Sequence, residues 1–409
     1  MKCRHCGAAL DLAMLDLGHA PPSNAFLDAD RLRAPEAWYP LRVLVCQSCW
    51  LVQTQEHDAD SALFGDDYAY FSSYSSSWLN HAQTYVASMI ERLRLGPQHR
   101  VVEVAANDGY LLQYVQQAGV PCYGVEPTAG TAAVALGKGL EVVQAFFGVE
   151  LARRLREQGR EADLMVANNV LAHVPDINDF VAGFAELLQP DGVATFEFAH
   201  LLQMVQGCQF DTAYHEHFYY LSLTAVERIF AANGLVVTDV QNLPTHGGSL
   251  RVFAQRSDTG RAVRGPAVDA LLAHERAMGI QDPAFYADFQ CQAIRIKHEL
   301  LAYLLQCRRD GISVAAYGAA AKGNTLLNFA GVRADLLPFV VDRSPSKQGR
   351  YLPGSRIPVL DESALERYRP DRILILPWNL QPELVRQLAY TRQWGARLVT
   401  AVPRLEELA

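Results

Sequence analysis

The sequence of 409 residues predicts an α/β protein in three parts: a small N-terminal four-cysteine zinc module, a Rossmann-like middle domain and a second, C-terminal Rossmann-like domain. Two CxxC pairs near the N-terminus predict the first part. Buried strands that alternate with helical segments predict the second, and the same alternation after a long helical stretch predicts the third. We place the boundaries at 1–58, 59–257 and 258–409, which suits a chain of this length.

The composition narrows the classes of function. Half of the residues are apolar, and the net charge is −8. An acidic chain without a concentrated basic surface is not expected to have nucleic acid as its main partner. No apolar run is long enough to span a bilayer, and the start "MKCRHCGAAL" has no apolar signal region. We therefore expect a cytoplasmic protein that contacts no membrane. The oligomeric state stays open, with a monomer among the alternatives.

Two CxxC pairs in a cytoplasmic chain predict a metal site before they predict disulfides. The pairs are "CRHC" and "CQSC", and their cysteines are Cys3, Cys6, Cys46 and Cys49. Each tight turn aims two thiolates at one point, so two turns complete a tetrahedral structural Zn²⁺ site. Redox CxxC motifs rarely come in pairs, and neither pair follows a βαβ pattern. We expect a small β insertion between the pairs, and we expect the isolated cysteines to be core residues: Cys122, Cys208, Cys291 and Cys307.

The middle domain is predicted from the order of its segments. Apolar residues at helical spacing precede the first strand, and further helices are expected at 149–158 and 176–188. The expected strands lie in "RVVEVAANDG", "CYGVEP", "ADLMVANN" and "GVATFEF". A last strand, "THGGSLRVFA", follows a turn that needs Gly247 and Gly248 and closes the sheet near residue 256. Alternating strands and helices predict a parallel, doubly wound sheet.

Ligands of such sheets bind at the carboxyl ends of the strands. "EVAANDG" (103–109) lies at the end of the first strand, where its turn lets backbone amides approach a ligand. Glu126 ends the second strand and suits a ribose diol as a two-point acceptor. These features predict a nucleoside cofactor without separating NAD from S-adenosylmethionine (SAM), although the G-x-G-x-x-G pattern of dinucleotide sites is absent.

The stretch "FDTAYHEHFYY" (210–220) gathers proton-handling groups among aromatic rings. An acid/base site, a metal site and a polar knot in a core all fit this composition. The metal interpretation is weaker, because the H-E-x-x-H spacing is missing. His215 and His217 would share a face only on a strand.

The C-terminal part begins with the linker-like "RSDTGRAVRGP" and a helical region at about 266–310. "SVAAYGAAAKGNTLLNFAG" then predicts strand, turn and helix, and later strands end at Asp342 and lie in "DRILILPWN" and "ARLVTAVP". Gly318 and Gly323 have the spacing of a P-loop, but Asn324 stands where its lysine would be. ATP hydrolysis is therefore not expected, and an NAD site here would lack the three-glycine fingerprint.

Taken in order, these motifs resemble the sugar C-methyltransferases, SAM-dependent enzymes that methylate a ring carbon of nucleotide-linked keto-deoxysugars. The resemblance covers essentially the whole chain: the paired CxxC module, "YAYFSSYSSS", "EVAANDG", "GVEP", "NNVLAHVPD", "YHEHFYY", "LPTHGGSLRV", "YGAAAKGN" and "VVDRSPSKQGRYLPG". It implies a class I methyltransferase domain in the middle, with SAM held by residues at the strand ends: Glu103, Asn107, Asp108, Gly109, Glu126 and Asn168. One departure is Ala105, where the first loop commonly has glycine.

The resemblance also implies the catalytic residues. His217 is the expected base that removes a proton alpha to the ketone, and Tyr214 is an expected donor to the developing oxyanion. Glu216 would orient an imidazole or bind a sugar hydroxyl, and His173 would line the sugar pocket. Tyr70, in a stretch that is either a lid or a linker, would close over the sugar. The role of His215 stays open.

Cations of the C-terminal domain are expected partners for the diphosphate of a nucleotide sugar, with dTDP as the expected nucleotide. They are Lys322, Lys347 and Arg350, although solvated surface charge is an equal alternative. His246 faces either solvent or the sugar. Two other functions stay open: an NAD-dependent nucleotide-sugar oxidoreductase that uses the C-terminal domain, and a non-catalytic nucleotide-binding protein.

Overall fold

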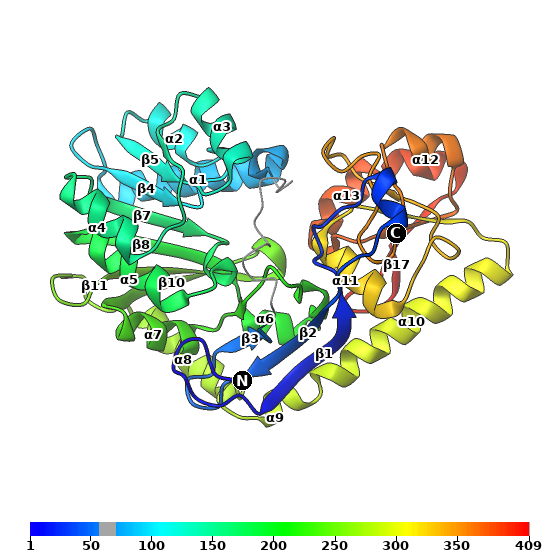
Figure 1. The fold of residues 1–409 in the computed structure, drawn as a ribbon, viewed down its shortest axis with the longest axis horizontal. Coiled ribbons are helices and arrows are strands. Elements are labelled where there is room, and N and C mark those ends of the chain that lie inside the picture. The colour runs from blue at the N-terminus through cyan, green and yellow to red at the C-terminus, as the bar shows by residue number, and fades with distance from the viewer. Residues whose placement is uncertain (57–70, 409) are drawn as a thin grey trace.

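The computed structural model describes residues 1–56 and 71–408, which form three sheets. Figure 1 shows the sheet of β10, β11, β8, β7, β4, β5 and β6 with its helices on one side, the C-terminal domain on the other, and strands β1 and β2 below and between them. The strand orders are β1-β2-β3-β9, β10-β11-β8-β7-β4-β5-β6 and β14-β13-β12-β15-β16-β17. The predicted α/β class with a four-cysteine module and two Rossmann-like sheets is confirmed.

The N-terminal sheet is antiparallel and contains the β insertion expected between the cysteine pairs. Its strands are β1 (Leu12–Ala20), β2 (Tyr39–Val45), β3 (Val52–Thr54) and β9 (Tyr219–Tyr220), with the 3₁₀ helix η1 (Ala29–Arg33) after β1. Strand β9 comes from the middle of the chain and pairs Tyr220 with Val52 and Tyr219 with Gln53. The stretch at 210–220 is therefore attached to the N-terminal module.

The seven-stranded sheet is parallel from β6 to β8 and antiparallel at β11 and β10. Its first strand is buried throughout, as both faces are covered by helices. β11 is the last strand in sequence, as predicted, but β10 forms the edge. The strands are β4 (Val101–Val104), β5 (Cys122–Val125), β6 (Val142–Val143), β7 (Ala162–Asn168), β8 (Leu188–Ala199), β10 (Leu235–Leu243) and β11 (Ser249–Arg256).

The helices of this part include the two predicted at 149–158 and 176–188, which agree with the prediction to within one residue at each end. They are α1 (Ser76–Leu93), α2 (Leu112–Gln117), α3 (Ala129–Gly137), α4 (Val149–Glu157), α5 (Ile177–Leu187), α6 (Leu201–Gln206) and α7 (Leu223–Ala232). The 3₁₀ helices among the described residues of this part lie in the loops: η3 (Ser72–Tyr74), η4 (Leu171–His173), η5 (Phe210–Thr212) and η6 (Thr245–Gly247). Helices η4, η5 and η6 bring the middle of the chain to the same region as the histidine-rich stretch.

The C-terminal sheet is parallel except at its last strand. Its strands are β12 (Val314–Tyr317), β13 (Val340–Val341), β14 (Val359–Leu360), β15 (Arg372–Ile375), β16 (Arg397–Thr400) and β17 (Glu406–Leu408). The helical stretch expected at 266–310 is divided into α8 (Pro266–Ala277), α9 (Ala284–Ala287) and α10 (Phe289–Arg309). The remaining helices are α11 (Ala321–Ala330), α12 (Ser363–Tyr368), η7 (Trp378–Leu380), α13 (Gln381–Gln387) and η8 (Ala389–Trp394).

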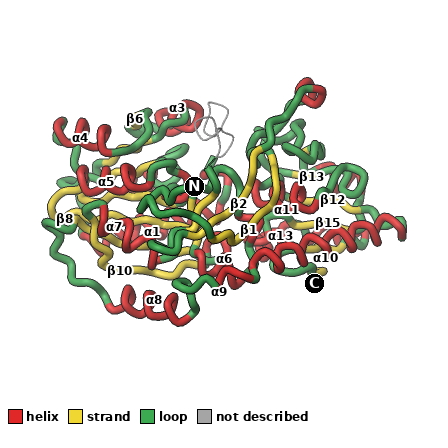
Figure 2. The backbone as a smooth tube through the Cα atoms, turned by 60° about the horizontal axis from the view of Figure 1, so that its bottom comes forward, coloured by secondary structure: helices red, strands yellow, loops and turns green. Residues whose placement is uncertain are grey.

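The N-terminal strands share a core with the C-terminal domain. Met14 and Val43 belong to the same buried cluster as Phe289 and Ile296 of α10. Figure 2 shows α10 running beside β1. The core expectation for the isolated cysteines is confirmed for Cys208 and Cys307, which are buried, and Cys122 is partly buried. It is wrong for Cys291, which is exposed on α10. Within residues 1–56 and 71–408, no helix is long and apolar enough to cross a bilayer.

Candidate active site and zinc centre

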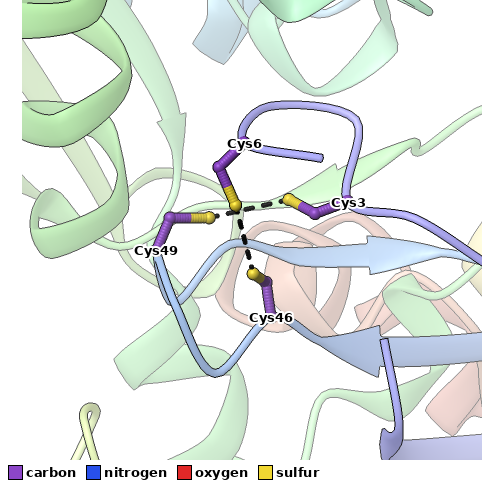
Figure 3. A group of neighbouring side chains, drawn as sticks. All are labelled: Cys3, Cys6, Cys46 and Cys49. Carbon is purple, nitrogen blue, oxygen red and sulfur yellow. Dashed lines mark hydrogen bonds between the residues drawn. The ribbon is translucent and has the colours of Figure 1, made fainter. Parts of the chain in front are cut away.

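The four predicted cysteines meet at one point. Figure 3 shows Cys3, Cys6, Cys46 and Cys49 with their sulfur atoms turned toward one another. All four Sγ atoms lie within 4.8 Å of one another, and the Cys3–Cys49 and Cys6–Cys46 pairs are 3.6 and 3.5 Å apart. Tetrahedral Zn²⁺ with bonds of about 2.3 Å places its sulfurs roughly 3.8 Å apart. The four sulfurs therefore fit a structural zinc site.

Gln53 of β3 holds one of the four sulfurs. Its side-chain Nε2 donates a hydrogen bond of 3.2 Å to Cys3 Sγ, and its side-chain Oε1 accepts one from the Arg4 backbone N–H. The hydrogen bond between Cys3 and Cys49 lowers the pKa of the Cys3 thiol and raises the pKa of the Cys49 thiol. His5 lies inside the first CxxC turn but pairs with Asn178 Oδ1 of α5 at 2.7 Å. It thus joins the zinc module to the middle domain, as a residue outside the ligand set.

The turn after β4 has the backbone of a close ligand approach. Ala105, Asn107 and Gly109 all have positive φ angles, of 59°, 51° and 74°. A Cβ at position 109 would lie 2.2 Å from Leu140 Cδ1, so only glycine fits there. The left-handed conformation at Ala105 explains why glycine is the common residue of this position in the resembled family. Alanine tolerates this conformation at a modest cost in strain.

Glu126 ends β5 beside this turn and is buried. Its carboxylate accepts hydrogen bonds from the backbone N–H groups of Asn107 (2.8 Å) and Thr128 (2.9 Å). Asp108 accepts from Ser73 and lies 3.8 Å from Lys138 Nζ. Among the described residues, Asp108 Oδ1 and Asn168 Oδ1 are buried without a hydrogen-bond partner. These acceptors fit the ammonium and ribose hydroxyl donors of SAM.

Glu103 lies deep behind this turn. It is 1% exposed on β4 and lies against Tyr110. Burial raises its pKa well above the usual range, and the charges of Asp108 and Glu126 raise it further. The raised pKa favours the neutral acid, so Glu103 adds little charge to this region.

His217 and Tyr214 form a hydrogen-bonded pair in the loop between η5 and β9. His217 Nδ1 lies 2.8 Å from the Thr212 carbonyl oxygen, so in the neutral ring this nitrogen carries the proton and donates. Nε2 is then the acceptor, and the Tyr214 hydroxyl donates to it at 2.7 Å. Burial lowers the pKa of His217 well below its usual value, and His173 lowers it further. The ring is held neutral with Nε2 able to take a proton.

His173 reaches the same point from η4. Its Nδ1 donates to the Glu216 carbonyl oxygen at 2.7 Å, and its ring centroid is 4.6 Å from that of His217. Burial lowers the pKa of His173 to about 4. The predicted group of His217, Tyr214 and His173 is thus brought together, with each side chain only partly buried.

The two other residues of the motif are buried beside this group. Glu216 Oε1 accepts hydrogen bonds from Asn24, and burial raises the pKa of the carboxyl. His215 packs against Tyr39 of β2, with its Nε2 3.3 Å from the Tyr39 carbonyl oxygen. His215 therefore serves the junction with the N-terminal sheet.

The C-terminal domain brings one cation to this group. The ammonium of Lys322 on α11 lies 4.5 Å from the centroid of the Trp378 ring and 3.2 Å from Asn379 Oδ1. Trp378 Nε1 donates to buried Asp211 Oδ2 at 2.8 Å. Burial lowers the pKa of Lys322 to about 8, and Asp211 opposes this shift. The Lys322 charge in turn lowers the pKa of His217.

The other predicted residues lie in several places. His246 Nε2 is 3.3 Å from Asn169 Nδ2, its ring is tilted against that of Trp78 with the centroids 5.2 Å apart, and burial lowers its pKa to about 4. Lys347 Nζ donates to the Ala319 carbonyl oxygen at 2.9 Å. Arg350 pairs with Asp28 of the N-terminal module at 3.3 Å. Tyr70 lies outside the described residues.

Three residues of the site were not predicted. Asp211 stands at the start of the histidine-rich stretch, and its position there was the available signal. Trp378 follows β15, a strand end at which a ligand-facing side chain is expected. Asn24 lies in a loop of the zinc module and carries no signal in the sequence.

Three family models match most of this chain. The model described as "Putative zinc binding domain" matches residues 3–64, "Methyltransferase domain" matches 78–240, and "C-methyltransferase C-terminal domain" matches 244–403. C-methyltransferase NovU from Streptomyces niveus is 34% identical over 402 residues, which cover 98% of this chain and 95% of the relative. The chain belongs to the C-methyltransferase family. The enzyme is a SAM-dependent C-methyltransferase with a zinc-binding N-terminal module.

More distant likenesses cover less of the enzyme. The ubiquinone biosynthesis O-methyltransferase of Chelativorans sp. (strain BNC1) is 30% identical over 95 residues, which is 23% of this chain and 38% of the relative. The crystal structure of magnesium protoporphyrin IX methyltransferase (ChlM) from Synechocystis PCC 6803 with bound SAH has a TM-score of 0.35 and 18% identity. It covers 44% of this chain and 83% of that chain.

Proposed function

We propose that the enzyme methylates the ring carbon next to the ketone of a nucleotide-linked 4-keto-deoxysugar, with dTDP as the nucleotide. The observation that carries this proposal is the His217–Tyr214 pair, in which a neutral imidazole nitrogen faces a phenol hydroxyl at 2.7 Å. Carbon methylation beside a ketone needs a base for the C–H proton and a donor for the enolate oxygen. This pair offers both groups at one place.

In the proposed reaction, His217 Nε2 accepts the alpha proton, and the electron pair of the broken C–H bond forms an enolate. Tyr214 turns its hydroxyl from Nε2 to the enolate oxygen, which it stabilises as a preorganised donor. SAM supplies the methyl group from its sulfonium, and the new C–C bond restores the ketone. The lowered pKa keeps His217 unprotonated at neutral pH, so the ring is available to accept the proton, and it also makes the imidazole a weaker base than a solvent-exposed histidine.

Two further residues have supporting roles in the proposal. His173 donates through Nδ1 to the Glu216 backbone and lines the sugar pocket beside His217. Glu216 accepts a hydrogen bond from a sugar hydroxyl. His246 borders the same pocket.

We propose that the three parts divide the work as 1–58, 59–257 and 258–409. The first holds zinc, the second holds SAM and the reacting groups, and the third holds the diphosphate. Lys322 is the cation best placed for the diphosphate, because its charge already acts on His217 and His246. Lys347 and Arg350 would have to exchange their present partners, Ala319 and Asp28, to join it.

Methyl transfer from labelled SAM to a panel of nucleotide-linked 4-keto-deoxysugars tests the proposal. We expect label in a C–C bond, with dTDP-linked acceptors preferred. His217→Asn should lower turnover by about 10²–10⁴-fold while SAM affinity, measured by calorimetry, stays unchanged. His298→Asn, on the exposed face of α10, is the matched control. Wild-type turnover of the His217 variant would remove the base role, and no transfer to any keto sugar would reject the substrate class.

A further inference from the structure

A loop of the zinc module reaches the histidine-rich loop of the methyltransferase domain. The loop, residues 21–25, follows β1, and Asn24 makes two contacts with one carboxylate oxygen. Its backbone N–H donates to Glu216 Oε1 at 3.1 Å, and its side-chain Nδ2 donates to the same oxygen at 3.2 Å. A residue of the first module thus touches the residue that precedes the proposed base.

The loop is fixed from the C-terminal domain as well. The hydroxyl of Ser23 lies 3.3 Å from that of Thr325, and Asn324 Nδ2 donates to the Ser23 carbonyl oxygen at 3.4 Å. Thr325 Oγ1 also donates to the carbonyl oxygen of Ala213, which precedes Tyr214. Helix α11, the 21–25 loop and the histidine-rich loop therefore support one another at a junction of all three parts.

The two carboxylate oxygens of Glu216 differ in their hydrogen bonds. Oε1 has two donors from Asn24, whereas Oε2 is buried and has no hydrogen-bond partner among the described residues. A buried charged oxygen without a partner is costly, so such an atom either accepts from a ligand or is protonated. Burial raises the pKa of Glu216, and the hydrogen bonds from Asn24 act in the opposite direction.

We propose that Asn24 is a positioning residue for methyl transfer: it holds Glu216 Oε1 so that Oε2 accepts a hydroxyl of the sugar. This inference rests on the proposed function of Glu216. It gives the zinc module a part in catalysis, because the loop that β1 carries to the active site is anchored in that module. Two N–H groups on one oxygen set the rotation of the carboxylate, and rotation determines where Oε2 lies.

The test compares Asn24→Ala, Asn24→Asp and Glu216→Gln, with Asp30→Ala on exposed η1 as the control. The substrate is the best acceptor of the panel. We expect Asn24→Ala to lower kcat about tenfold, because the side-chain hydrogen bond to Glu216 Oε1 is lost while the backbone hydrogen bond remains. Asn24→Asp has the same size but places a like charge beside Glu216, so its loss should be larger. Zinc content and SAM affinity should match those of the wild type in both Asn24 variants.

A double-mutant cycle decides whether Asn24 acts through Glu216. Asn24→Ala should cost little further activity in the Glu216→Gln background. Equal fold-losses in both backgrounds would overturn the inference. So would wild-type kcat in Asn24→Ala together with a damaged Glu216→Gln, an outcome that leaves the proposed function standing. Wild-type kcat in Glu216→Gln would instead reject the proposed role of Glu216.

The zinc content of the variants is the second control. If Asn24→Ala loses zinc, the test is made with Asn24→Asp. Loss of zinc in both variants would make Asn24 a structural residue and overturn the inference.

Discussion

In each Rossmann-like sheet, the first turn and an acidic residue after the second strand meet at the position where ligands of such sheets bind, which we call the crevice. The two crevices differ in their charges. In the first sheet, Glu126 at the end of β5 accepts from the amides of Asn107 and Thr128. In the second, Asp342 after β13 accepts from the amides of Ala319 and Ser344, both at 2.8 Å. An acidic residue after the second strand braces the first turn in both domains.

The difference lies in the charge near each carboxylate. In the second crevice, Lys347 Nζ lies 3.7 Å from Asp342 and donates to the Ala319 carbonyl oxygen, so the chain neutralises its own acid. In the first, Asp108 and Glu126 are both buried, and Lys138 Nζ lies 3.8 Å from Asp108. An acidic crevice favours a cationic ligand such as SAM over an anionic dinucleotide. Two similar backbones thus differ in function: the first crevice suits SAM, and in the second the acid is paired with Lys347 of the same domain.

The largest expected difference between the two crevices is in SAM affinity, when Glu126 or Asp342 is replaced by alanine. Glu126→Ala should weaken SAM binding about 30-fold or more, because charge-assisted hydrogen bonds are worth roughly 1.5–3 kcal/mol each. Asp342→Ala should change SAM affinity less than twofold. Calorimetric titration with SAM, and with NAD as the comparison ligand, measures both. Equal losses of SAM affinity, or NAD binding that depends on Asp342, would break the distinction between the two crevices.

Much of this organisation could be predicted from local patterns. The zinc cluster follows from two CxxC turns, and both sheets follow from alternating strands and helices. The closeness of His217, Glu216 and Tyr214 in the sequence marked the histidine-rich stretch, for which an acid/base site, a metal site and a polar knot were the alternatives, and the family resemblance favoured the acid/base site. Such features need only short-range information, since the residues that act together are near one another in the chain.

The residues that complete the site could not be found in this way. Asn24 and Glu216 are 192 positions apart, and Asp211 and Trp378 are 167 apart. Both contacts depend on how the three parts pack, and Asn24 and Trp378 stand in no periodic or spaced pattern. The two-residue strand β9 is too short to show alternation, so its pairing with β3 was also missed. Cys291 shows the converse: burial was expected for its residue type, but its position on α10 faces solvent.

A smaller effect, on the pH dependence of activity, is expected from a change at Asp211. Asp211 belongs to the histidine-rich stretch and acts on Lys322 of α11, the helix that follows the second crevice. Asp211→Asn keeps an acceptor for Trp378 but removes the charge that raises the pKa of Lys322. Lys322 has a lowered pKa of about 8, so if its cation binds substrate, activity falls as pH rises through about 8. Without Asp211 the pKa falls further, and the basic limb moves to lower pH by roughly one unit.

The pH profile of kcat/KM measures this shift. The titratable groups that face Lys322 are Asp211 from η5, His217 from the histidine-rich loop and His246 from η6. Both histidines have lowered pKa values and stay neutral across the basic limb, so they do not produce it. Lys322→Met should remove the limb altogether. A basic limb that stays in place in Asp211→Asn would show that the Lys322 charge does not govern substrate binding.

The smallest effect is expected at Lys347, which tests whether this lysine stays paired with the acid of the second crevice. Lys347→Ala removes a bond to Ala319 and an ion pair with Asp342, both of which are partly buried. We expect a loss of about 1 kcal/mol in the free energy of unfolding, measured with urea, because an exposed or half-buried ion pair contributes little. SAM affinity should not change, and KM for the nucleotide sugar should rise less than in Lys322→Met. Lys2→Ala, on the exposed N-terminus, is the control.

The contradicting outcome is a rise in KM for Lys347→Ala that equals or exceeds the rise for Lys322→Met. Lys347 would then leave Asp342 to bind the diphosphate, and the second crevice would be a substrate site.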